Sequence, residues 1–84
     1  MEFEVIWTPP ATNQLTDIWL AATDRNAVTL AQTAVDKLLA GDPFGCSRHL
    51  SEGLSTLRVP PLRVYFTVDR QLRKVSVEEV QLGF

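Results

Sequence analysis

The chain begins with alternating apolar and polar residues and then changes to a helical period. Residues 2–7 read EFEVIW, and this alternation predicts a half-buried strand. From 9 to 22, and again from about 26 to 41, apolar residues recur every three or four positions, which predicts two helices. Thr8 can cap the first helix, and Pro9 suits its first position. The short break between the helices predicts an antiparallel helical hairpin.

The second half of the chain returns to alternation after an aperiodic segment. Residues 43–53 contain one proline and two glycines and have no period, so we expect a loop. Three strands are predicted after it, at about 54–59, 62–69 and 73–82. The order β-α-α-β-β-β predicts one α+β domain over 1–84, with a small antiparallel-type sheet and the helical hairpin packed on one of its faces.

The segment LRVPPLRVYFTV predicts a hairpin that turns at Pro60 and Pro61. Side chains alternate across a strand, so this register puts six apolar residues on one face: Leu57, Val59, Leu62, Val64, Phe66 and Val68. It puts five mostly polar residues on the other: Thr56, Arg58, Arg63, Tyr65 and Thr67. Proline at the third turn position is disfavoured in a type I turn and is required, in cis, in a type VI turn, so either Pro61 is cis or the connection is wider than two residues. About 5–6% of X–Pro bonds are cis, so the wider loop is expected.

The same register sets Arg58 directly opposite Arg63. Like charges at that position destabilise a sheet by roughly 0.2–1 kcal/mol. Either both side chains extend into water or meet a carboxylate such as Glu78, or they form an anion site beside Tyr65. In the last strand, the apolar positions change parity between Val77 and Val80. That change predicts a bulge near Glu78, or a strand end that packs on a partner.

Composition narrows the class of protein without naming a function. The net charge is −2 and the isoelectric point is about 5.2, which argues against a protein that wraps nucleic acid non-specifically. No apolar run approaches the ~20 residues that span a bilayer, and the acidic N-terminus does not resemble a signal peptide, so we expect a cytoplasmic protein. No sequence motif implies a metal or a cofactor.

Two further side chains have reactive chemistry. His49 is the only histidine, and a lone histidine in a polar loop is usually a surface residue. Its position shortly before the arginine strand also allows a role in proton transfer. Cys46 is the only cysteine, so an internal disulfide is excluded and a free, partly buried thiol is expected.

The element order and length, together with three segments, resemble the RelE/ParE superfamily, toxins of bacterial type II toxin–antitoxin pairs that include plasmid-stabilisation proteins. The segments are EVIWTPPATNQLTDIW, DPFGCSRHLSEGLSTLRV and LRVYFTVD. Arg58 and Arg63 lie where this family has two arginines. The resemblance covers nearly the whole chain and rests on the combination of features, because each motif alone is loose.

RelE-like members cleave mRNA in the ribosome without a metal, using basic residues and often a tyrosine on the open sheet face. The resemblance implies that Arg63 stabilises a phosphate, that Arg58 supports it, and that Tyr65 completes the candidate catalytic set. The chain departs from that pattern where Leu54 and Thr56 replace the lysines expected before the first arginine.

The last strand departs as well, because Glu78 and Glu79 occupy a region where a basic and aromatic cluster is expected. ParE-like members act instead on DNA gyrase through protein contacts and have no catalytic residues. A third alternative is a non-catalytic, non-toxic interaction module on the same scaffold. All three imply a cognate antitoxin whose C-terminal segment folds onto the chain, and all three are compatible with a dimer or a toxin–antitoxin hetero-oligomer.

Overall fold

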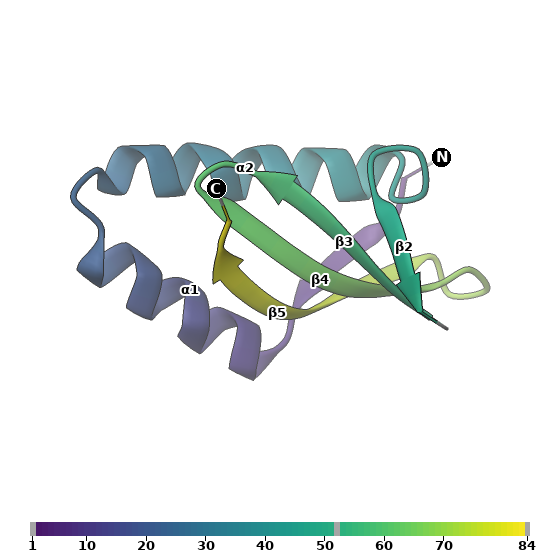
Figure 1. The fold of residues 1–84 in the computed structure, drawn as a ribbon. Coiled ribbons are helices and arrows are strands. Elements are labelled where there is room, and N and C mark those ends of the chain that lie inside the picture. The colour runs from purple at the N-terminus through teal and green to yellow at the C-terminus, as the bar shows by residue number, and fades with distance from the viewer. Residues whose placement is uncertain (1, 52, 84) are drawn as a thin grey trace.

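The computed structural model describes residues 2–51 and 53–83. Over this part of the chain it contains two helices and five strands (Figure 1). In chain order they are β1 (Glu4–Trp7), α1 (Pro9–Ala21), α2 (Arg25–Gly41), β2 (Arg48–Ser51), β3 (Leu54–Val59), β4 (Leu62–Asp69) and β5 (Lys74–Leu82). The predicted α+β class is confirmed.

The strands form one mixed sheet in the order β1-β5-β4-β3-β2. Strands β2 to β5 pair antiparallel, whereas β1 pairs parallel with β5. The parallel edge was not predicted, because alternation within a strand carries no information about its neighbour. β2 lies in the segment predicted as a loop, and that prediction was wrong. All four β2 residues are exposed, so their side chains show no apolar period, and the strand forms through its backbone pairing with β3.

The two helices cover one face of the sheet, and no helix lies on the near side of β3, β4 and β5 in Figure 1. The core between helices and sheet is apolar. Its buried members are Ala11, Leu15, Val28, Ala31, Val35, Leu39, Leu57, Leu62, Val64, Phe66, Val75, Val77 and Val80. Val59 and Val68 are half-buried against this core, so all six apolar residues predicted to share one face do so.

α1 also protects the sheet edge that β1 leaves open. Thr8 caps α1 by accepting the Ala11 N–H, and both its own N–H and its hydroxyl donate to the Val77 carbonyl, at 3.1 and 2.8 Å. One turn later, the Gln14 side chain accepts the Val80 N–H at 2.7 Å. The Val77 carbonyl and the Val80 N–H, at the end of β5 beyond β1, therefore have partners in Thr8 and Gln14.

The hairpin register is confirmed, with Arg58 opposite Arg63 and Val59 opposite Leu62. The expectation of a wider loop was wrong: the connection has two residues and the Pro60–Pro61 bond is cis. Of the two alternatives, the cis form is the one that allows a two-residue turn with proline at its third position, as in a type VI turn. The bulge is also confirmed, because Tyr65 pairs with Glu79 while Phe66 pairs with Val77, which leaves Glu78 without a partner in β4.

Candidate functional site on the open face of the sheet

The sheet face that no helix covers, called here the open face, carries the polar half of each alternating strand. Its central rows follow from the strand registers. One row runs Arg48, Thr56, Tyr65 and Glu79 across β2, β3, β4 and β5. The next row runs Arg58, Arg63 and Gln81 across β3, β4 and β5. All three predicted site residues therefore share one face and lie on neighbouring positions of adjacent strands.

A hollow of about 350 Å³ lies over β2, β3 and β4 on this face, and we call it the arginine hollow. The side chains that give it its character are Arg48, Leu50, Thr56, Arg58, Arg63 and Tyr65, with Cys46 and Ser47 at its loop end. Three guanidinium groups on one hollow favour an anionic ligand, because each presents a planar set of donors that matches a carboxylate or a phosphate.

The backbone that follows β5 lies close to Arg63. After β5 the chain continues along the hairpin turn, where the Gly83 N–H donates to the Pro61 carbonyl at 2.8 Å. A Cβ on Gly83 would lie 2.7 Å from the Cβ of Arg63, closer than non-bonded carbons tolerate. Glycine at this position therefore lets the chain pass close to Arg63.

Tyr65 separates the arginine hollow from a second hollow of about 570 Å³, which we call the glutamate hollow. Its lining residues are Gln14, Leu54, Tyr65, Glu78, Glu79 and Gln81. The bulge at Glu78 brings two consecutive carboxylates to this hollow, which a regular strand would send to opposite faces. The open face is consequently positive at the arginine hollow over β2 to β4 and negative at the bulged part of β5 around Glu78 and Glu79.

Sequence reasoning missed Arg48, because β2 lay in a segment expected to be a loop. The pairing of Arg48 with Thr56 adds a third arginine to the face that holds Arg58 and Arg63. A four-residue edge strand with no buried side chain gives no pattern from which to recognise it.

His49 lies on the opposite side of the sheet from the arginines. It pairs with Ser55, whose partner Phe66 is fully buried in the core. It lines a separate hollow of about 420 Å³ with Phe44 and Arg70, whose guanidinium carbon lies 4.2 Å from the Phe44 ring centroid. The expectation of a surface histidine agrees with its exposure, and the alternative role in proton transfer beside the arginines does not fit this geometry.

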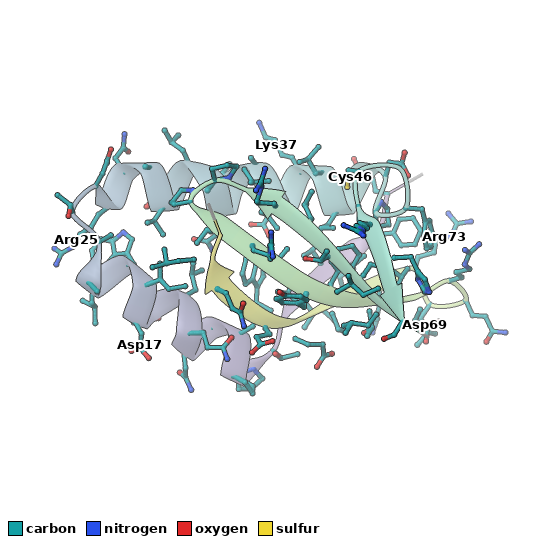
Figure 2. All side chains as sticks on the ribbon, in the orientation of Figure 1. Asp17, Arg25, Lys37, Cys46, Asp69 and Arg73 are labelled. Atoms are coloured by element: carbon teal, nitrogen blue, oxygen red, sulfur yellow. The ribbon has the colours of Figure 1, made fainter. Side chains whose placement is uncertain are left out.

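Cys46 lies in the loop between α2 and β2 (Figure 2), at the rim of the arginine hollow. Burial is the largest effect on its thiol and raises the pKa; a backbone hydrogen bond lowers it by less, and the negative charge of Asp42 adds a still smaller increase. Its Sγ lies 3.7 Å from the Leu38 carbonyl, as expected of a protonated thiol that donates weakly. The thiol is free, and its environment does not favour a nucleophilic thiolate.

Neither a metal centre nor a membrane span can be assigned to the described part of the chain. Within residues 2–51 and 53–83, no three side chains among histidine, cysteine, aspartate and glutamate gather closely enough to hold a metal ion. No helix in the same ranges is long and apolar enough to cross a membrane.

Sequence comparison finds no matching family model and no matching curated protein. Solved structures do match over nearly the whole chain. A chain of the toxin–antitoxin complex RelBE2 from Mycobacterium tuberculosis has a TM-score of 0.83 at 15% identity, covering 99% of this chain and 93% of that one. The archaeal RelE–RelB complex from Pyrococcus horikoshii matches with a TM-score of 0.72 at 11% identity, covering 98% and 96%.

A chain of the chromosomal ParDE toxin–antitoxin system from P. aeruginosa matches with a TM-score of 0.68 at 18% identity, covering 99% of this chain and 98% of that chain. These structures represent both branches of the family that the sequence resembles. At such low identity the agreement concerns the fold, and it extends from β1 to β5. The chain has the fold of the RelE/ParE superfamily toxins.

Proposed function

We propose that this chain is the toxin component of a bacterial toxin–antitoxin pair, acts in the cytoplasm on translation or on DNA gyrase, and is neutralised by a cognate antitoxin. The observation that carries the proposal is the arginine hollow. In a fold shared with solved toxin–antitoxin chains, Arg48, Arg58 and Arg63 line one hollow with Tyr65 on the open face. Because a sheet built only for stability gains nothing from opposed arginines, their position favours a binding role.

The proposal is tested by expressing the chain in bacteria alone and together with the reading frame next to its gene. Growth arrest that the neighbouring product relieves is the expected result, and harmless expression of the folded chain alone contradicts it. Arg63→Ala should abolish or strongly weaken the arrest, because it removes one of the three guanidinium groups. Lys37→Ala, an exposed change on α2 that removes the same charge, is the matched control and should remain toxic.

The target follows from a second measurement on the arrested cells. Cleavage of messages only while they are translated identifies an endoribonuclease, whereas accumulation of gyrase-dependent DNA breaks identifies a gyrase poison. The two results assign different roles to the arginine hollow. In the first it holds the phosphate that is attacked, and in the second it contacts an acidic surface of the protein target.

A non-catalytic interaction module is the second candidate, and the composition of the arginine hollow favours it. Cleavage through a 2′-hydroxyl needs a group that accepts its proton and one that protonates the leaving oxygen. Among the described residues that line this hollow there is no histidine, carboxylate or lysine, and arginine donates hydrogen bonds but does not accept them. The hydroxyls of Ser47 and Thr56 donate to backbone carbonyls, which leaves Tyr65 as the described residue of this hollow whose side-chain oxygen is best suited to exchange a proton with a substrate. Binding without growth arrest and without RNA cleavage would support this candidate.

A further inference from the structure

The open face presents opposite charges in two adjacent hollows that share one wall. Arg48 and Arg63 line the arginine hollow, Glu78 and Glu79 line the glutamate hollow, and Tyr65 lines both. Over residues 2–51 and 53–83, none of these four charged side chains makes an ion pair with another described residue. The positive charge of the arginine hollow and the negative charge of the glutamate hollow therefore do not neutralise each other. Both remain available to a ligand that spans the two hollows.

The spacing between the charges follows from the sheet itself. Arg48 and Glu79 belong to one row across four strands, so their Cα atoms lie three strand spacings apart, or roughly 15 Å. Arg63 and Glu79 lie on neighbouring strands and two positions apart along them, which gives roughly 8 Å. An extended polypeptide rises ~3.3 Å per residue. Two to four residues of extended chain therefore cover the distance between the hollows.

Nucleic acid fits this charge pattern poorly. A strand that left the arginine hollow over β5 would bring its phosphates against Glu78 and Glu79, and like charges in contact disfavour binding. The other basic side chains near the sheet, Arg70, Arg73 and Lys74, lie in or beside the β4–β5 turn. The nearest of them along β4, Arg70, is seven positions after Arg63, or roughly 23 Å of extended strand. The described residues thus do not form the continuous basic track on which non-specific nucleic-acid binding depends.

We infer that the open face binds a polypeptide segment of another protein, with an acidic side chain in the arginine hollow and a basic side chain in the glutamate hollow. The two side chains are two to four positions apart along an extended segment, which passes over Tyr65. The tyrosine offers an apolar ring and a hydroxyl to the segment between its two charged anchors. The inference rests on the proposed function only in treating the open face as the working surface, because binding does not require toxicity.

The inference is tested by selecting binders from a random twelve-residue peptide library displayed on phage. The bait is the purified chain, in its natural form and in two variants, Glu78→Gln with Glu79→Gln and Arg48→Gln with Arg63→Gln. Asp17→Asn on α1 and Lys37→Gln on α2, both exposed on the helices (Figure 2), are controls that each remove one charge of the corresponding sign outside the open face. Circular dichroism establishes that every bait is folded before selection.

The natural chain and both controls should enrich peptides in which an acidic and a basic residue recur two to four positions apart. The glutamine pair at Glu78 and Glu79 should lose the basic preference and keep the acidic one, and the pair at Arg48 and Arg63 should do the reverse. In fluorescence anisotropy with the most enriched peptide, removing either charge pair should weaken binding about fivefold or more, and the controls should change it less than about twofold.

Three outcomes overturn the inference. The first is enrichment of peptides without a recurring spacing between acidic and basic residues, or enrichment of the same peptides after Glu78 and Glu79 are replaced. The second is tighter binding of a labelled ten-nucleotide single-stranded RNA than of any selected peptide. The third is a dimer in sedimentation that dissociates in both variants, which would make the occupant a second copy of this chain. Growth arrest in cells is scored separately, so loss of toxicity contradicts the proposed function while charge-patterned peptide binding by the same protein still supports this inference.

Discussion

The two faces of β3 and β4 are built from alternate residues of the same short strands, and they differ in almost every property. Toward the helices, Leu62, Val64 and Phe66 are fully buried. Toward the open side, Arg63 and Tyr65 are half-buried and line hollows. Neighbours in the sequence therefore serve different purposes: the inward residues supply the free energy of folding, and the outward ones supply a charged surface.

This separation has a physical basis in the pleat of a strand, which sends successive side chains to opposite faces. It lets a domain of 84 residues keep an apolar core and still carry three arginines in one hollow. The cost of the charged face is small because water reaches it, and opposed like charges on a sheet cost only about 0.2–1 kcal/mol. Substitutions on the two faces should therefore have separable effects on stability and on binding.

The largest effect is expected from Phe66→Ala, which removes a fully buried ring from the centre of the core. Large-to-small substitutions of this kind cost about 3–5 kcal/mol, a large part of the stability of a small domain. Tyr65→Phe, one position away on the open face, should change the free energy of unfolding by less than about 0.5 kcal/mol. Urea unfolding followed by circular dichroism measures both, and equal losses at the two positions would contradict the division between the faces.

Gln14→Ala tests the side-chain hydrogen bond by which α1 covers the edge of β5. The Gln14 side chain accepts the Val80 N–H at 2.7 Å, close to the bulge that brings Glu78 and Glu79 to the glutamate hollow. Removing this acceptor leaves a partly buried N–H without its partner and should cost about 1 kcal/mol in urea unfolding. The neighbouring exposed residue serves as control, since Asn13→Ala should cost much less. A loss at Asn13 as large as that at Gln14 would contradict this account of the edge.

Arg63→Gln should have a smaller effect and the opposite sign. Arg63 lies directly across from Arg58, so removing its charge relieves a like-charge pair and should raise the free energy of unfolding by about 0.2–1 kcal/mol. The gain should shrink at high salt, because ions screen exposed charges. Thermal unfolding at low and high ionic strength measures this, with Lys37→Gln as the control for loss of one positive charge. A salt-independent loss of stability would mean that the arginine is held by structural contacts.

The strands and helices with strong periodicity were predictable from the sequence, and so was the register of the central hairpin. Core residues on both sides of Pro60 and Pro61 agree in parity, and this agreement determined which face Arg58 and Arg63 share. The bulge was predictable for the same reason, because a change of parity between Val77 and Val80 has few other causes. Burial of one apolar face makes apolar residues recur at regular intervals in the sequence. The periodic strands and helices, the hairpin register and the bulge can all be predicted from this recurrence.

The features that sequence reasoning missed are those that leave no such period. β2 exposes all four of its residues, so neither the strand nor the contribution of Arg48 to the arginine hollow was predictable. The parallel pairing of β1 with β5 depends on where the helical hairpin returns the chain, which a local pattern does not record. The cis bond before Pro61 was not expected because few X–Pro bonds in folded proteins are cis, although a two-residue turn of type VI requires one.

The smallest expected effect concerns Cys46, which lies at the rim of the arginine hollow and belongs to neither face. Burial raises the pKa of its thiol above the ordinary value of 9.0, with Asp42 acting in the same direction. As pH rises through the ordinary value, the thiol of the unfolded chain loses its proton while the folded chain still holds it. The unfolded state then binds fewer protons, so the free energy of unfolding falls, and the fall levels off above the raised pKa.

Cys46→Ser removes this titration and should therefore lose less stability than the natural chain between about pH 8 and about pH 10, while below pH 8 the difference between the two proteins should not depend on pH. Urea unfolding of both proteins at matched pH isolates the thiol, because every other ionisable group is present in both proteins and cancels in the comparison. Alkylation by iodoacetamide gives an independent reading, since a raised pKa leaves less thiolate and should make the folded chain react more slowly than the urea-unfolded chain. Faster alkylation of the folded chain would mean that the three arginines of the neighbouring hollow stabilise the thiolate more than burial disfavours it, and the positive field of the open face would then extend beyond its rim.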